Sequence, residues 1–338
     1  MNAALPVSTT YAKALNAALL EMMREDERIH FLGEDILDPY GGAFKISKGL
    51  SSAFPDRVIT TPISEAGFTG LATGMALRGL RPIVEIMFGD FLAIAADQII
   101  NHMAKFVTMY GHDLEVPVVV RTPMGGGRGY GATHSQSLEK IFLGTPNLTV
   151  VAPSHAHDPG KLLRNAVTLG RPVLFIEHKM LYPETLLESG GALTVQALTD
   201  APFPTVLMKN YSRGSADVFI VAYGGMSRIL APLARRMAEE EINIAVALPS
   251  LLSPMTVQPL VPLVAECGRV LVVEEGTEGF DWGAEVAAQL YAATFRNLKA
   301  PIARLASRPE IIPTSTAGEN AMLVSAGDVE SKILELLA

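Results

Sequence analysis

Short apolar segments alternate with longer helical patterns along the first half of the chain. The segments are apolar on both faces, and they cover residues 29–32, 58–60, 82–87, 116–121, 148–152 and 173–177. Strands of this kind, separated by helices, are typical of a parallel sheet that is covered on both sides. The pattern therefore predicts an α/β fold.

The pattern lapses after residue 184, and glycine and proline then interrupt a polar, weakly periodic stretch. Apolar segments return at residues 218–223, 244–248, 269–274 and 302–305, with helices expected over 227–240, 256–267 and 283–291. We expect an N-terminal domain over residues 1–188, a linker over 189–212 and a smaller α/β domain over 213–338.

Composition and charge exclude several classes of partner. The 35 acidic and 27 basic residues give a formal charge of -8, and no cluster of Lys and Arg could neutralise phosphates, so nucleic acid is not expected. A single cysteine, Cys267, excludes an internal disulfide and indicates a reducing compartment. Residues 1–10 lack a signal-peptide pattern, and no apolar stretch could span a bilayer. We expect a cytoplasmic protein without membrane contact.

Ligands of open parallel sheets bind beyond the carboxyl ends of the strands, which directs attention to three loops. The first, residues 61–70, follows a strand and begins a helix, with Ser64 at the N-cap and Glu65 in the first turn. Glu65 is either an ordinary first-turn acid or a functional carboxylate. Glycines at 67, 70 and 74 favour a close helix contact, within the chain or with another subunit.

The second and third loops carry aromatic and glycine residues. Phe88 and Phe91 precede a helix expected over residues 92–105, and their rings either close the core or stack on a planar ligand. The glycine-rich span 123–137 ends with His134, which is either a helix-start cap or a functional imidazole. This span does not match the GxxxxGK[ST] phosphate loop.

Together the loops resemble the beta subunits of the heterotetrameric 2-oxo acid dehydrogenase E1 components of the pyruvate, branched-chain and acetoin types. The resemblance covers nearly the whole chain and is closest over residues 61–68, 96–101, 134–139, 175–182 and 272–276. It implies an N-terminal pyrimidine-binding domain and a C-terminal domain, both transketolase-like.

The resemblance also implies roles for individual residues. Glu65 matches the glutamate that bonds the pyrimidine nitrogen of thiamine diphosphate and so lets the exocyclic nitrogen deprotonate the thiazolium carbon. Phe91 matches the aromatic residue that packs on the pyrimidine, with Met87 and Phe88 as nearby contacts. His134 matches the histidine that faces the substrate, where Ser135 assists by hydrogen bonding.

Two metal sites follow from the same resemblance. Some family members bind potassium through backbone carbonyls at positions that match Val118, Ala166, Val167, Leu169 and Arg171, where Leu169 and Arg171 replace polar residues of the family. The family's Gly-Asp-Gly motif for diphosphate and magnesium has no convincing match here. We therefore expect magnesium and the diphosphate half of the cofactor on an alpha subunit.

The function implied is oxidative decarboxylation of a 2-oxo acid with acyl transfer to lipoamide. The enzyme would be an alpha2beta2 assembly, active only with its alpha subunit and docked on a lipoyl acyltransferase E2. Two alternatives stay open: a two-subunit thiamine enzyme that forms acyloins or passes an acyl or ketol fragment to a biosynthetic acceptor, and a non-catalytic supporting subunit. The sequence does not identify the 2-oxo acid.

Overall fold

The apolar segments of the first half form a seven-stranded sheet in the order β11-β5-β6-β4-β3-β1-β2. Six strands are mutually parallel, and the seventh, β11, pairs antiparallel with β5. The computed structural model describes residues 9–111 and 114–338. In it the strands are β1 (Ile29–Gly33), β2 (Val58–Thr60), β3 (Arg81–Glu85), β4 (Val119–Met124), β5 (Thr149–Val151), β6 (Val173–His178) and β11 (Leu251–Ser253).

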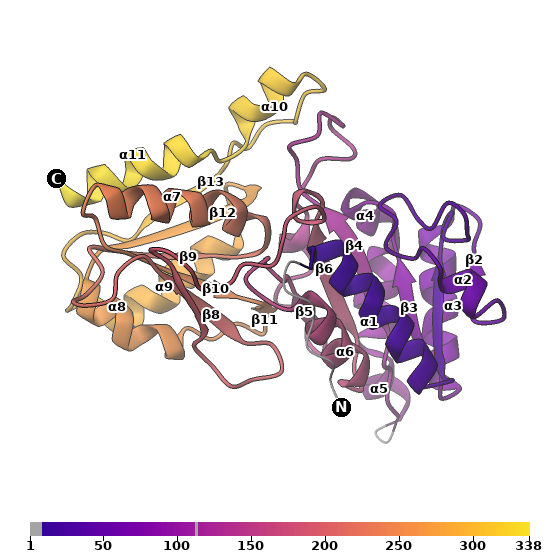
Figure 1. Ribbon diagram of the computed structural model, residues 1–338. Coiled ribbons are helices and arrows are strands. Elements are labelled where there is room, and N and C mark those ends of the chain that lie inside the picture. Colours follow the sequence, from indigo (N-terminus) through magenta and orange to yellow (C-terminus); the bar gives the residue numbers. More distant parts are fainter. Residues whose placement is uncertain (1–8, 112–113) are drawn as a thin grey trace.

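Helices cover both faces of this sheet, as the two-sided apolar strands require (Figure 1). They are α1 (Tyr11–Glu25), α2 (Leu50–Ala53), α3 (Glu65–Leu77), α4 (Leu92–Asp97), α5 (Phe106–Tyr110) and α6 (Pro159–Thr168). Helix α1 packs closely on α6, because a Cβ at Gly160 would lie only 2.7 Å from the Ala14 carbonyl oxygen. The helix expected over residues 92–105 is α4 followed by a π-helical segment, η2 (Gln98–Met103).

The second half forms a six-stranded sheet in the order β13-β12-β9-β10-β8-β7. Its strands are β7 (Thr194–Ala197), β8 (Thr205–Lys209), β9 (Val218–Ala222), β10 (Ile244–Pro249), β12 (Val270–Thr277) and β13 (Ala303–Ser307). Its helices are α7 (Ser227–Glu239), α8 (Val261–Cys267), α9 (Trp282–Thr294), α10 (Thr316–Met322) and α11 (Ala326–Leu337). The order and the helices give a second α/β domain beside the first (Figure 1).

Residues 189–212, expected to be a linker, contain β7 and β8, so this expectation was wrong for those strands. Both pair antiparallel at one edge of the second sheet. The outer strand, β7, is largely exposed, so its sequence lacks the apolar run that marks a buried strand. Strand β11 follows β10 in the chain, but it leaves the second sheet and pairs with β5 in the first.

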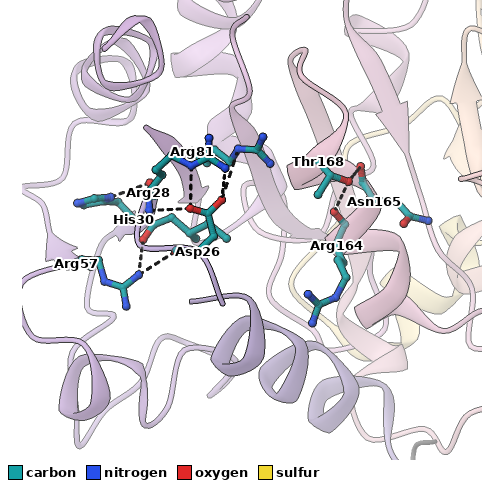
Figure 2. A network of polar contacts seen from close by, with 9 residues as sticks. Asp26, Arg28, His30, Arg57, Arg81, Arg164, Asn165 and Thr168 are labelled. Atoms are coloured by element: carbon teal, nitrogen blue, oxygen red, sulfur yellow. Dashed lines mark hydrogen bonds and ion pairs between the residues drawn. The ribbon is translucent and has the colours of Figure 1, made fainter. Parts of the chain in front are cut away.

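A polar network fixes the amino ends of β1 and β3, at the edge opposite the candidate site. Figure 2 shows Asp26 with Arg28 and Arg81 around it and Arg57 nearby. Two guanidinium nitrogens of Arg28 donate to the Asp26 carboxylate at 2.9 and 2.7 Å, and Arg81 lies 3.7 Å away. The side-chain hydrogen bond from Arg28 lowers the pKa of Asp26 to about 2. Arg57 donates to the Met23 carbonyl at 2.6 Å, which ties the end of α1 to the start of β2.

The two domains meet near the carboxyl ends of the first sheet. His178, at the end of β6, lies 2.7 Å from the Glu275 carboxylate on β12. The Lys140 ammonium donates to three oxygens of the second domain at 2.8 to 3.0 Å, on Thr277 and Gly279. These contacts place the second domain against the loops that carry the candidate residues. Among the described residues, no helix is both long and apolar enough to cross a membrane.

Candidate active site

The candidate catalytic and cofactor-contacting residues all follow carboxyl ends of strands in the first sheet. Glu65 comes after β2, the aromatic residues come after β3, and His134 comes after β4. Strands β4 and β3 are neighbours, and β1 separates β3 from β2. Helix α3, which Glu65 begins, packs on α4, which Phe91 precedes. The fold therefore gathers the three loops at one edge.

Glu65 is the first residue of α3, and it is only 4% exposed. Ser64 occupies the N-cap position, as expected, but its hydroxyl makes no capping hydrogen bond. No hydrogen bond or ion pair joins the Glu65 carboxylate to another of the described residues. The free amides of the first helical turn favour a negative charge at this position. A buried carboxylate of this kind is suited to a hydrogen-bond donor from outside the chain.

Sequence reasoning missed Glu34, which follows β1 directly. It lies close enough to Glu65 for the charge of Glu65 to raise its pKa. Glu34 is 6% exposed, and its Oε1 atom has no hydrogen-bond partner in the described chain. Burial, and then the charges of Glu65 and Asp35, raise the pKa of Glu34 to about 7. Its carboxyl group therefore exchanges protons near neutral pH. The signal was its position, because an acid at the end of a buried parallel strand faces the ligand edge.

Phe88, Phe91 and His134 form one aromatic cluster. The His134 ring centroid lies 4.7 Å from that of Phe88 and 5.2 Å from that of Phe91, and both contacts are edge-to-face. All three side chains are half-buried, as is Met87. Each therefore keeps surface that a planar ligand could cover.

The hydroxyl group beside the imidazole belongs to Thr133 rather than to Ser135. The Thr133 Oγ1 atom lies 3.0 Å from His134 Nδ1. Ser135 is 1% exposed, and its hydroxyl makes no hydrogen bond in the described chain. The expected assistance from Ser135 has no geometric support, because its hydroxyl is buried and makes no contact with the imidazole in the described residues.

Asp90, to which no role was assigned from the sequence, joins the second loop to the third. One carboxylate oxygen of Asp90 accepts hydrogen bonds from the Gln136 main chain at 3.3 Å and from its side-chain amide at 2.9 Å. The other oxygen, Oδ2, is buried and has no partner among the described residues. The bond fixes the spacing between the Phe88–Phe91 turn and the His134 loop.

The five residues expected to offer carbonyls to potassium lie apart from this cluster. Val118 precedes β4, and the other four, Ala166, Val167, Leu169 and Arg171, lie at or beyond the carboxyl end of α6. Carbonyls at a helix carboxyl end lack intrahelical donors, which suits cation binding. Two of these oxygens already accept a hydrogen bond: Val118 from Val173 at 2.9 Å and Ala166 from Leu169 at 3.3 Å. The exposed Arg171 side chain lines a cavity of about 760 Å³ between the domains.

Comparison with known proteins assigns the family. Residues 7–185 match the transketolase pyrimidine-binding domain, and residues 209–329 match the transketolase C-terminal domain. The chain is 35% identical over 325 residues to the beta subunit of acetoin:2,6-dichlorophenolindophenol oxidoreductase from Cupriavidus necator, and the match covers 94% of each chain. It is 34% identical over 330 residues to the 2-oxoisovalerate dehydrogenase subunit beta of Bacillus subtilis, covering 97% of this chain and 98% of that one. The chain belongs to the E1 beta subunit family of 2-oxo acid dehydrogenases.

A further relative agrees with this assignment, and two solved structures agree with the fold. The mitochondrial pyruvate dehydrogenase E1 component subunit beta-1 of Arabidopsis thaliana is 35% identical over 322 residues, which are 95% of this chain and 87% of that one. A split-gene transketolase, solved as an inactive beta4 tetramer, superposes with a TM-score of 0.70 over 98% of each chain at 20% identity. A transketolase mutant from Pichia stipitis gives 0.65 at 14% identity, over 98% of this chain and 46% of that one. The family resemblance and the two transketolase-like domains are thus confirmed.

E1 beta subunits belong to a family that depends on thiamine diphosphate and works with an alpha partner. The residues present fit the pyrimidine half of this cofactor, because a buried carboxylate without a partner lies at the same edge as half-buried aromatic rings. Within residues 9–111 and 114–338, no group of three or more His, Cys, Asp or Glu side chains is placed to hold a metal ion.

Proposed function

We propose that this E1 beta subunit joins an alpha subunit in an alpha2beta2 enzyme that oxidatively decarboxylates a 2-oxo acid and transfers the acyl group to the lipoyl group of an E2 acyltransferase. The observation that carries the proposal is the buried Glu65 carboxylate without a partner at the start of α3. The identity of 33 to 36% to named dehydrogenase beta subunits over most of the chain supports it.

Thiamine diphosphate, when bound, supplies a carbon nucleophile that attacks the 2-oxo carbon. The Glu65 carboxylate would hold the proton at the pyrimidine nitrogen, and Phe91 would orient the pyrimidine ring with Met87 and Phe88 beside it. The His134 imidazole, edge-on to two aromatic rings, would move a proton at the substrate. Ser135 would act in substrate binding only through its main chain, since its hydroxyl is buried.

The alpha subunit would supply the diphosphate and magnesium ligands and pack on the exposed face of α3. Three large apolar side chains are exposed on or beside it: Leu71 on α3 by 52%, Ile63 just before α3 by 86% and Ile94 on α4 by 54%. Gly70 contacts Gln98 within the chain, but a Cβ at Gly74 would meet nothing within 4 Å. An exposed apolar patch is typical of an interaction site, and this one borders Glu65. Potassium at the α6 carboxyl end would stabilise the same domain.

Glu65→Gln tests the proposal, with Glu285→Gln as its matched control. Glu285 is also a first-turn acid, on α9, so its variant loses the same helix-terminus interaction without touching the site. In the assembled enzyme with cofactor, exchange of the thiazolium proton should slow by roughly 10² or more in the Glu65 variant and stay unchanged in the control. Exchange at the wild-type rate in the Glu65 variant would make Glu65 a structural acid.

The acetoin relative favours one alternative, in which acetoin or another acyloin takes the place of the 2-oxo acid. Assays of acyl-lipoamide formation and of acyloin turnover in the assembled enzyme separate the two. The non-catalytic alternative is weakened because the chain keeps Glu65, Phe91 and His134 together at one edge of the sheet. It would be supported only if neither assay shows turnover that depends on Glu65.

A further inference from the structure

Lys179 is a lysine in the protein interior whose ammonium group contacts the main chain of the His134 loop. It follows β6 and begins the short helix η4 (Lys179–Leu181). The residue is 0% exposed, and its Nζ atom donates to the carbonyl oxygen of His134. Lysine is almost never fully buried unless its charge is offset, because desolvating an ammonium group is costly.

Two aromatic rings lie near the ammonium group, and three carboxylates act on it through their charge. The Nζ atom lies 5.4 Å from the ring centroid of Phe88 and 5.8 Å from that of Tyr130, within the range of cation–π attraction. Burial lowers the pKa of Lys179 to about 8, against the charges of Asp90, Glu275 and Glu319, which raise it, while Arg128 lowers it further. The ammonium form is therefore lost as the pH rises through about 8.

The loop that ends at His134 is rich in glycines with positive φ angles. Four of its glycines have positive φ angles: Gly125, Gly127, Gly129 and Gly131. Glycine gives the backbone most freedom, so such a loop depends on contacts from outside. Two carboxylates hold its first part, since the Gly126 amide donates to Glu275 at 2.7 Å and the Gly129 amide donates to Glu319 on α10 at 2.6 Å. In Figure 1, α10 lies above the second domain and next to a magenta loop that extends from the first.

Lys179 bonds the main chain at His134 itself, whereas Asp90 bonds the loop two positions later, at Gln136. Lys179 also lies over the Phe88 ring, against which the imidazole packs. One cation therefore contacts both the backbone and the packing surface of His134.

We propose that Lys179 is a positioning residue for His134, whose ammonium group fixes the loop so that the imidazole stays edge-on to Phe88 and Phe91. The proposal rests on the proposed function in that His134 serves the substrate step. Lys179 itself touches neither substrate nor cofactor in this role. Sequence reasoning missed it because the contact joins loops 45 positions apart.

The first test measures loop order without any turnover. Hydrogen exchange of the amides over residues 131–137 is followed in the assembled alpha–beta complex for the wild type, Lys179→Met and Lys140→Met. Lys140 is the control because its ammonium group also bonds main-chain oxygens, but it is half-buried and lies between the domains. The Lys179 variant should lose protection by about ten-fold or more, and the control should keep it. Unchanged protection in Lys179→Met would overturn the proposal.

The second test uses the pH profile of acyl transfer, with thiazolium proton exchange as the untouched step. In the wild type, acyl transfer should fall as the pH rises through about 8, because the ammonium group loses its proton. Acyl transfer by Lys179→Met should be slow at every pH and should not fall further as the pH rises through about 8. Lys179→Arg should restore the rate, and the fall in its acyl transfer should move to a pH higher by more than about one unit. If acyl transfer by Lys179→Met still falls as the pH rises through about 8, another group causes the fall and the proposed role of Lys179 in it is wrong.

The two proposals fail in different ways. A wild-type complex that processes neither a 2-oxo acid nor an acyloin would contradict the proposed function, yet the exchange measurement would still test Lys179. If Lys179→Met does not assemble, Lys179→Arg carries the test, since it keeps the cation and should keep the loop protected. Loss of protection in Lys179→Arg as well would refute a role for the charge.

Discussion

Arg121→Met should strongly destabilise the first domain, because it removes the cation between two buried carboxylates. Arg121 is 1% exposed and donates to Glu177 at 2.7 Å through Nε, and also to Glu85. Tyr182 donates to the same Glu177 carboxylate at 2.8 Å. Glu85 ends β3 and Glu177 lies near the end of β6, just before the Phe88 and Lys179 loops. The network therefore sets the positions from which both loops begin.

The magnitude follows from the two carboxylates that the variant leaves unpaired. Breaking a buried ion pair on one side costs about 3–5 kcal/mol. A carboxyl group can escape by taking up a proton, which at pH 7 costs roughly 3.7 kcal/mol relative to a free glutamate and at pH 5 only about 1 kcal/mol. Burial already raises the pKa of Glu85 in the wild type. The free energy of unfolding should thus fall by about 3–5 kcal/mol at pH 7 and by clearly less at pH 5.

Urea denaturation measures the effect domain by domain. Far-UV circular dichroism follows both domains, and fluorescence of the single tryptophan, Trp282 on α9, follows the second. In Arg121→Met, the circular dichroism signal should begin to change at a lower urea concentration than the tryptophan fluorescence. Arg81→Met is the control, because its partner Asp26 is 3.7 Å away and partly exposed, so the loss should stay below about 1 kcal/mol. A loss of the same size at pH 5 and pH 7, or one below about 1 kcal/mol, would refute this reasoning.

Two other substitutions test the site and the opposite edge of the sheet. His134→Ala should leave thiazolium proton exchange fast but slow acyl transfer by roughly 10² or more, and loss of assembly with normal chemistry per site would instead make His134 a structural anchor. Asp26→Asn should lower the thermal midpoint at pH 6 but not near pH 2, since the depressed pKa of Asp26 stabilises the fold only above the unfolded pKa of about 3.9 and this stability is lost as the pH falls towards about 2. A difference in midpoint that does not change with pH would contradict the role of the Arg28 contact.

Most of the strands that are buried on two faces could be predicted, because their apolar runs are local in sequence. Strand β8 is also buried but was missed, since its apolar run covers only Val206 to Met208. Helix α7 was predicted over 227–240 and spans Ser227–Glu239. Strand β7 could not be predicted, since an exposed antiparallel edge lacks the apolar run. Strand β11 was missed for another reason, because its partner β5 lies about a hundred residues earlier and only the tertiary fold brings them together.

The candidate site also contains residues that local motifs locate and properties that only the tertiary fold determines. Glu65 and Phe91 could be located because each stands in a local motif at a strand end. Glu34 could have been located in the same way from its position after β1, but its raised pKa, like the lowered pKa of Lys179, follows from burial and from charges that the chain order does not reveal. The residues of the substrate pocket could not be predicted from the sequence, because the proposed alpha subunit would complete the pocket.

Reconstitution tests the central claim most directly. Production of acyl-lipoamide from 2-oxo acids would be measured with thiamine diphosphate and magnesium for this chain alone, for the alpha subunit alone and for the two together. We expect turnover only in the mixture, and its loss when Glu65→Gln replaces the wild-type chain. Substantial turnover by this chain alone, free of any second subunit, would contradict the divided site.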